Sequence, residues 1–258
     1  MIVTNTQSGT NVHEVTEGIY RISTPIPPSV APGGFSYNQY LIVDDEPLLF
    51  HTGLRKMFPL VREAVATVIP VERLRYLAFS HVEADECGSL NEWLAVAPEA
   101  LPVCGRIAAM TSISDLADRP PRVLKDEGTL SLGKHVVQWF DTPHMPHAWE
   151  SGVLMESHTR TLLCSDLFAQ SGADLPPLTE SDILGPSEVT RKAMDYYSHT
   201  TNTGEMLERL ASLEPATLAC MHGSAWHGNG AELLRALAGI LSDKETCVMI
   251  EIQDGELI

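Results

Sequence analysis

Hydrophobic and polar positions in the first fifty residues follow a pattern that predicts β-strands. Runs of β-branched and aromatic residues alternate with turn-forming residues, which is the usual signal of a hairpin. Asp44-Asp45-Glu46 forms the expected turn between two of these strands, and the proline-rich stretch Pro25–Gly34 is predicted to be a loop. The predicted strands are Gly18–Thr24, Tyr37–Val43 and Pro47–His51.

Beyond residue 60, stretches with the helical period of apolar residues alternate with short apolar runs that suit buried strands. Helices are predicted at Leu60–Val68, Asn91–Ala97, Ile107–Leu116, Pro186–Tyr197, Thr203–Leu213 and Ala231–Leu241. Strands are predicted at Arg75–Ser80, Pro102–Cys104, Thr129–Leu132, His135–Phe140, Gly152–Glu156, Thr161–Cys164, Thr217–Met221 and Cys247–Ile252. Two strand-rich stretches, each followed by helices, predict an α/β fold with two sheets face to face and helices outside, a four-layer αββα sandwich in one domain spanning residues 1–258.

Composition and charge exclude several classes of function. The chain has 44% hydrophobic and 20% charged residues, which is enough to form a globular core. Its 17 basic and 34 acidic residues give a net charge of −17, and the basic residues form no cluster, so nucleic acid is not an expected partner. The sequence has neither a secretory signal pattern nor an apolar run long enough to span a membrane, and a cytoplasmic protein is expected. Five scattered cysteines predict reduced thiols rather than a disulfide framework.

Histidines and carboxylates follow the ends of four predicted strands. Taken singly, each such residue is more simply explained as a polar loop residue or a helix cap. Together they predict a metal site, because loops that follow the carboxyl ends of strands are where α/β proteins usually build their sites. The candidate ligands are His81, Glu83, Asp85, His147, Asp166 and His222.

The motifs around these residues resemble the metallo-β-lactamase fold and, within it, the diiron domain of flavodiiron proteins. The segment His81-Val82-Glu83-Ala84-Asp85 matches the family's His-x-Glu-x-Asp pattern, and His147-Ala148-Trp149-Glu150-Ser151 approximates its His-Trp-Pro-Asp-Ser segment. Ser165-Asp166-Leu167-Phe168 matches the segment of the bridging aspartate, and His222-Gly223-Ser224-Ala225-Trp226 matches the last histidine motif. Four motifs in the family's order make this resemblance specific.

The resemblance implies a site for two iron ions. One iron would bind His81, Glu83 and His147, the other would bind Asp85 and His222, and Asp166 would bridge them. Three imidazoles and three carboxylates without a thiolate suit iron or manganese and are acceptable to zinc. The implied function is binding of O2 or NO, with slow reduction, by a sensor, a carrier or a reductase that receives electrons from a separate donor.

The sequence departs from the family pattern at several positions. Glu86 stands where the family has a histidine, and it either binds as a carboxylate or leaves a coordination position open. His51 replaces an aspartate that usually lies beside the ligands. His144 and His227 are near predicted ligands and are either site partners or ordinary polar loop residues. The flavodoxin-like domain of flavodiiron proteins has no counterpart in the sequence, so no flavin is expected on this chain, and a homodimer remains only an implication of the family.

Two alternatives remain open from the sequence alone. The first is a metallo-β-lactamase superfamily hydrolase with two zinc or manganese ions, in which the metal activates a bridging hydroxide. Glu83 and Glu86 argue against it, because both replace histidines of the hydrolase pattern. The second is a signalling module in which the metal site changes the affinity for a partner protein.

Overall fold

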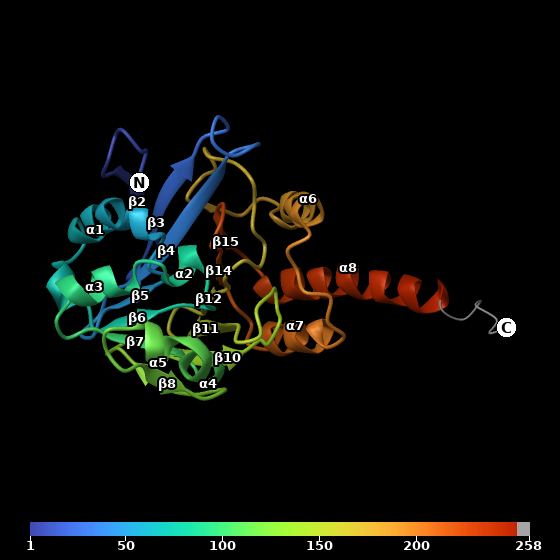
Figure 1. Ribbon diagram of the computed structural model, residues 1–258. Coiled ribbons are helices and arrows are strands. Elements are labelled where there is room, and N and C mark those ends of the chain that lie inside the picture. The colour runs from blue at the N-terminus through green and yellow to red at the C-terminus, as the bar shows by residue number, and fades with distance from the viewer. Residues whose placement is uncertain (252–258) are drawn as a thin grey trace.

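Two β-sheets pack face to face, and helices cover both outer faces (Figure 1). The structure is a computed structural model, and it describes residues 1–251. Within these residues one sheet has eight strands and the other has seven. The predicted αββα sandwich is confirmed.

The eight-stranded sheet is built from the first half of the chain. Its first five strands pair antiparallel in sequence order, and the next three continue the sheet in parallel. Parallel neighbours require a crossover, and the crossovers here carry helices. The strands are β1 (Ile2–Val3), β2 (Asn11–Thr16), β3 (Ile19–Ile26), β4 (Phe35–Ile42), β5 (Leu48–Phe50), β6 (Tyr76–Ala78), β7 (Leu101–Gly105) and β8 (Arg122–Leu124).

The seven-stranded sheet comes from the second half, in the order β13-β15-β14-β12-β11-β10-β9. Strands β10 and β12 both pair antiparallel with β11, and β12 pairs in parallel with β14. The carboxyl ends of β10, β12 and β14 therefore meet at one edge of this sheet. The strands are β9 (Thr129–Ser131), β10 (Val136–Asp141), β11 (Gly152–Glu156), β12 (Thr161–Leu163), β13 (Leu178–Thr179), β14 (Thr217–Ala219) and β15 (Ala225–His227).

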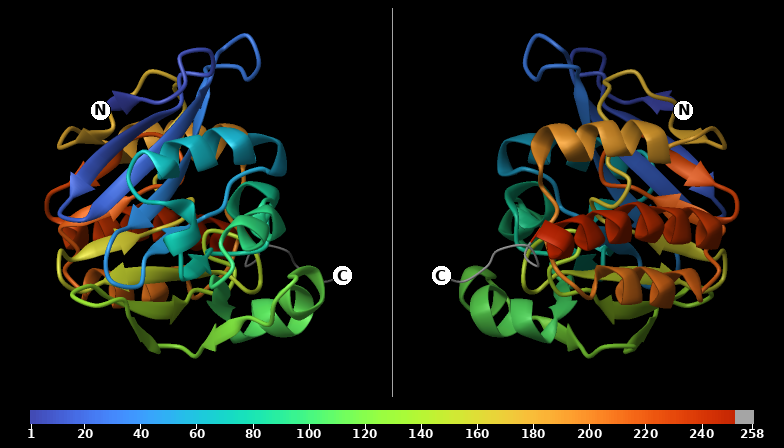
Figure 2. Two further views of the ribbon diagram at one scale, coloured as in Figure 1. Left: turned by 90° about the vertical axis from the view of Figure 1, so that its left-hand side faces the viewer. Right: turned by 90° about the vertical axis from the view of Figure 1, so that its right-hand side faces the viewer.

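The helices fall into two groups, one on each outer face, as the two opposite views of Figure 2 show. Apolar side chains at helical spacing attach them to the sheets; α7, for example, buries Met206, Leu207 and Leu210. The first group contains η1 (Arg55–Met57), α1 (Phe58–Ala66), η2 (Val71–Arg73), α2 (Ala84–Cys87), α3 (Leu90–Val96), α4 (Arg106–Ala108), the π-turn η3 (Ala109–Ile113) and α5 (Ser114–Leu116). The second group contains α6 (Leu184–Met194), α7 (Thr203–Ala211) and α8 (Gly230–Glu251). No helix in residues 1–251 combines the length and the apolar character needed to cross a membrane.

The sequence pattern missed several short strands and misassigned one segment. Strands β1, β2, β8, β13 and β15 were not predicted, because short or edge strands carry few apolar residues. The strand predicted at Cys247–Ile252 is wrong over 247–251, where α8 continues to Glu251, and Ile252 lies outside the described residues. A short apolar run has no clear period, and extending an existing helix avoids the cost of nucleating a new element.

The core between the sheets is centred on Trp139 of β10, which is fully buried. An added Cβ on Gly152 would lie 2.1 Å from its ring, and one on Gly105 would lie 3.0 Å from it. The two glycines thus leave room for the indole, one on each sheet. Its Nε1 donates a hydrogen bond to Asp141. The close packing of the two sheets here depends on the absence of two side chains.

Backbone hydrogen bonds join the two sheets at the edge where the candidate ligands lie. The Gly152 amide in the second sheet donates to the Ser80 carbonyl, which follows β6 of the first sheet (2.9 Å). In the opposite sense, the Asn38 amide of β4 donates to the Met221 carbonyl, which follows β14 (2.9 Å). Each sheet therefore holds a loop of the other in place.

Candidate metal centre

The six predicted ligands follow the strand ends as expected and converge between the two sheets. His81 lies in a bend just after β6, Glu83 follows it in extended backbone, and His147 follows β10. Asp85 does not continue the extended segment, because α2 begins at Ala84; it reaches the site from the first turn of that helix. Asp166 and His222 follow β12 and β14, respectively, and these two strands pair in parallel.

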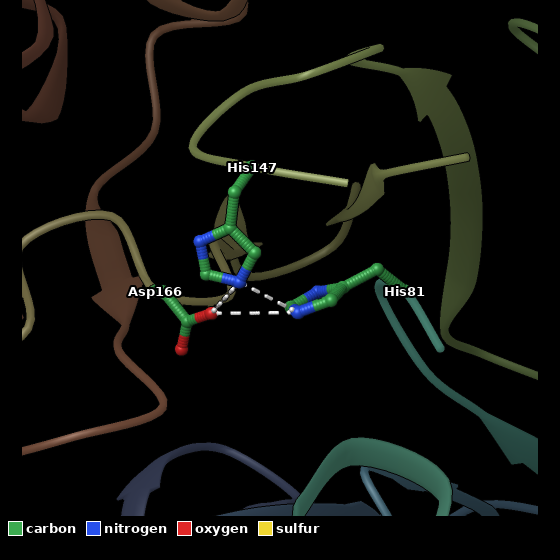
Figure 3. A group of neighbouring side chains, drawn as sticks. All are labelled: His81, His147 and Asp166. Atoms are coloured by element: carbon green, nitrogen blue, oxygen red, sulfur yellow. Dashed lines mark hydrogen bonds and ion pairs between the residues drawn. The ribbon is translucent and has the colours of Figure 1, made fainter. Parts of the chain in front are cut away.

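One group of donor atoms surrounds a single point at the edge of β6 and β10. The Nε2 atoms of His81 and His147 are 3.0 Å apart, and Glu83 Oε2 lies 3.1 Å from the first and 3.2 Å from the second. Asp166 Oδ2 lies 3.7 Å from His81 Nε2 and 3.5 Å from His147 Nε2 (Figure 3). These four atoms form one potential coordination group.

The second oxygen of Asp166 faces a different group. Its Oδ1 lies 3.1 Å from His222 Nε2, and the same nitrogen lies 3.5 Å from Asp85 Oδ2. Asp166 is buried, so its two oxygens reach both groups from within the protein. The carboxylate therefore has the geometry of a bridge between two neighbouring cation positions.

Backbone carbonyls fix the orientation of two of the imidazoles. His147 Nδ1 lies 3.1 Å from the Tyr196 carbonyl, and His222 Nδ1 lies 2.8 Å from the Ser36 carbonyl. A carbonyl only accepts hydrogen bonds, so Nδ1 must carry the hydrogen in both residues. In the neutral ring, Nε2 then presents its lone pair to the site, which is the arrangement of a metal-binding histidine.

A buried hydrogen-bond network holds the Nδ1 side of His81. Ser80 Oγ lies 2.9 Å from His81 Nδ1 and 3.0 Å from His51 Nε2, and Ser165 Oγ donates to it at 2.8 Å. Burial lowers the pKa of His51 to about 3, so this imidazole stays neutral. The sequence singled out His51 as a substitution beside the site, but it carried no sign of the two serines.

Glu86 is a buried carboxylate at the margin of the site. Its side chain is 1% exposed, and Oε2 lies 3.9 Å from His81 Nε2 without a hydrogen-bond partner. Burial, reinforced by the charges of Asp166 and Asp85, raises the pKa of Glu86 well above its usual value. A buried carboxylate oxygen without a partner is costly unless a cation or donor meets it.

The site opens to a cavity of about 210 Å³. Neither lysine nor arginine is among the described residues that line it. Phe35 stacks on His222 with 4.2 Å between ring centroids, and Met194 and Tyr196 form part of the wall. The cavity therefore joins an acidic, imidazole-rich floor to a largely apolar wall.

The donor set fits metal ions. Donors held about 2.1 Å from one ion at ordinary coordination angles lie roughly 3.0–3.4 Å from each other, close to the separations seen here. Burial lowers the pKa of His147 and of His222, but hydrogen bonds with Glu83 and Asp166, respectively, outweigh it, so both values are raised. The carboxylates thus favour positive charge at the imidazoles, and a divalent cation supplies it.

The remaining histidines near the predicted motifs lie apart from this group. His144 is exposed in the loop after β10. His227 Nδ1 contacts Thr217 Oγ1 at 3.2 Å, and Thr217 begins β14 whereas His222 follows its end. His227 therefore sits at the far end of that strand and provides a natural control for His222.

Metal binding should stabilise the fold, because it removes the repulsion among the clustered carboxylates. Binding at one hundred times the dissociation constant adds about 2.7 kcal/mol per site, which raises Tm by roughly 5–10 °C in a chain of this size. We expect this shift with Fe(II) under anaerobic conditions in differential scanning fluorimetry. His222→Ala should remove at least half of it and His227→Ala should retain it; equal shifts in both variants would contradict the assignment of His222.

A family model described as "ODP family beta lactamase" matches residues 35–223. Among curated proteins, rubredoxin-oxygen oxidoreductase of Megalodesulfovibrio gigas is 30% identical over 210 residues, which are 78% of this chain and 51% of that protein. Nitric oxide reductase of Moorella thermoacetica is 25% identical over 219 residues, 80% of this chain and 53% of that protein. The chain thus spans about half the length of these two relatives.

Solved structures with the same fold include flavodiiron proteins. The rubredoxin oxygen:oxidoreductase of Desulfovibrio gigas superposes with a TM-score of 0.73 at 23% identity, covering 89% of this chain and 62% of that one. The flavodiiron protein of Giardia intestinalis gives a TM-score of 0.77 at 20% identity, and the match covers 90% of this chain and 59% of that one. A fragment of putative diflavin flavoprotein A 5 from Nostoc gives 0.77 at 18% identity and covers 95% of this chain and 98% of the fragment.

The matched segment contains every residue of the candidate centre and well over half of the sequence. The chain therefore belongs to the ODP family beta lactamases, and its metallo-β-lactamase-like domain is homologous to the diiron domain of flavodiiron proteins.

Proposed function

We propose that the chain holds two iron ions and binds O2 or NO at them, with slow reduction of the bound gas by electrons from a separate donor. The observation that carries this proposal is the placement of Asp166, whose two carboxylate oxygens face two different groups of ligands. The relatives support it, since their names specify an oxygen oxidoreductase and a nitric oxide reductase.

Each ligand has a place in this proposal. His81, Glu83 and His147 would hold one iron, Asp85 and His222 the other, and Asp166 would join them. The unpartnered oxygen of Glu86 makes that residue a candidate for one further carboxylate contact. Iron held by carboxylates and imidazoles supplies the one-electron chemistry that binding and reducing O2 or NO require.

Other groups of the protein fix the orientation of the proposed ligands, and apolar side chains restrict which molecules can enter the cavity. The carbonyls of Tyr196 and Ser36 hold two imidazoles with Nε2 directed inward, so little reorientation is needed when metal binds. The Tyr196 hydroxyl donates to the Asp166 backbone carbonyl at 2.9 Å, which fixes the loop that carries the bridge. Phe35 and Met194 narrow the cavity with apolar surface, which suits a small uncharged gas better than a charged substrate.

The partners follow from the chemistry of the proposal. Reduction of O2 or NO consumes electrons, so a reductase role requires a donor, for which we propose a separate protein. A sensor or carrier role requires only reversible binding, followed in a sensor by a change in affinity for a partner. A homodimer and a cytoplasmic location remain predictions from the sequence.

The test is the metal content of protein purified without oxygen from iron-supplemented cells, followed by the visible spectrum on admission of air. We expect about two irons per chain and a new absorption band, with His227→Ala behaving like the unmodified protein. Two zinc ions, no spectral change and turnover of phosphoesters, thioesters or lactams would instead support the hydrolase alternative.

A further inference from the structure

Two buried cysteine thiols are in contact at the start of the loops that carry Asp166 and His222. Cys164 follows β12 and Cys220 follows β14, and these strands pair in parallel with Leu163 opposite Ala219. The register thus sets the two cysteines opposite each other, with their Sγ atoms 3.9 Å apart. Both side chains are fully buried in the same apolar core, which includes Leu167.

The backbone at this position already suits a disulfide. Paired strands lie about 4.7–4.9 Å apart, and this spacing falls within the roughly 4.4–6.8 Å between Cα atoms that disulfides span. Formation of the bond requires the distance between the two Sγ atoms to shorten from 3.9 Å to about 2.05 Å. We therefore expect rotation of the two side chains to be the main change that bond formation requires.

The thiols are also linked to the centre through the chain. Cys164 precedes Asp166 by two residues, and Cys220 precedes His222 by two residues. The Cys220 carbonyl accepts hydrogen bonds from Tyr40 Oη at 2.8 Å and Asn38 Nδ2 at 3.0 Å, so the backbone is held while the side chain rotates. Because both thiols are buried, soluble oxidants have no direct access to them, whereas the metal centre lies at the ends of the same two loops.

We propose that Cys164 and Cys220 are an internal two-electron donor to the metal centre. The step rests on the proposed function, because its oxidant is the pair of ferric ions. Two S–H bonds break and one S–S bond forms; the two electrons reduce two Fe(III) to two Fe(II), and the two protons pass to solvent. The chain thus stores two reducing equivalents of its own.

The experiment follows the two thiols through one reaction with oxygen. Iron-loaded and iron-free proteins are exposed to air, quenched in acid, alkylated after denaturation and mapped by mass spectrometry. We expect a peptide pair joined through Cys164 and Cys220, lighter by two hydrogen atoms, at close to one per iron-loaded chain, while the iron-free protein keeps both thiols. Iron content and the visible spectrum are measured on the same samples.

Variants separate the donor role from a packing role. Cys164→Ala or Cys220→Ala should reduce the electrons available per chain by two in a single-turnover oxygen titration. Cys104→Ala removes an equally buried thiol from the core of the first sheet and should leave the titration unchanged.

Two outcomes would overturn the proposal, and they differ. If the chain binds two irons and its spectrum changes with air, but both thiols still alkylate, the donor role is wrong and the proposed function stands. If the chain binds no iron, the proposed function fails and the donor role fails with it. The disulfide map needs no substitution, so it decides the matter even if an alanine variant does not fold.

Discussion

Asp166→Asn should leave the protein folded and remove its capacity to hold two metal ions. Asparagine has nearly the same shape, but it offers one neutral oxygen and an amide that donates hydrogen bonds. The bridge requires two anionic oxygens, one facing His147 and one facing His222. We expect the iron content to fall from about two per chain to one or less, and the absorption change with air to disappear.

The control for this prediction is a second aspartate. Asp182 accepts hydrogen bonds from the amides of Leu184 and Gly185 at the start of α6, and asparagine serves equally well there. Asp182→Asn should therefore keep both irons. The metal-free Tm of Asp166→Asn should stay within a few degrees of the unmodified value, because the substitution also removes a charge that opposes Glu86. Two irons and an unchanged spectrum in Asp166→Asn would contradict the bridging role.

Gly152→Ala should cause the largest loss of stability among single additions of a methyl group near the centre. The new Cβ would lie 2.1 Å from the Trp139 ring, and the indole is fully buried in the packed core, so the ring has little space into which to move. Overpacking of this kind typically costs 1–3 kcal/mol. We expect about 3 kcal/mol, a fall in Tm of roughly 6–12 °C, measured by thermal and urea unfolding.

A double substitution tests the cause of that loss. In Gly152→Ala combined with Trp139→Leu, the second change removes the ring that the methyl group would meet, so the combined cost should be smaller than the sum of the single costs. Gly239→Ala is the matched control, since an added Cβ there meets nothing within 4 Å and a helical alanine is favoured over glycine. Strictly additive costs would show that Trp139 is not the obstacle.

The candidate ligands were predictable because their segments follow strands whose apolar runs are visible in the sequence. His81, Asp166 and His222 lie just past β6, β12 and β14, as the pattern indicated. The groups that orient them were not predictable to the same degree. Backbone carbonyls such as those of Ser36 and Tyr196 exist at every residue, so no side-chain pattern marks the ones that meet an imidazole.

The end of α6 differs from its predicted position, and the difference affects a residue that contacts His147. The sequence predicts a helix over Pro186–Tyr197, but α6 ends at Met194, and Asp195 adopts a left-handed conformation with φ 49°. Tyr196 therefore lies beyond the helix, in the segment after α6, and its carbonyl meets His147 Nδ1 there. Aspartate tolerates this conformation better than most residues, but the sequence alone did not place the helix end there.

Strand β2 was missed for a different reason. Strand β2 has Val12 and Val15 buried among polar neighbours, and such a short alternation also occurs in loops. Its pairing with β3 depends on tertiary structure, since an isolated short strand has little stability by itself. The central strands, which are apolar on both faces, carry a stronger signal, and they are the ones that position the centre.

The reciprocal backbone bonds between the sheets have a kinetic consequence. Because the Gly152 amide donates to the Ser80 carbonyl and the Asn38 amide donates to the Met221 carbonyl, an outward movement of either candidate-ligand loop breaks a hydrogen bond to the other sheet. Metal ions held as proposed would therefore rest on loops whose backbone hydrogen bonds belong to both layers. If the centre holds metal as proposed, we expect the rate of metal loss to depend on local opening of this edge as well as on the affinity of the individual side chains.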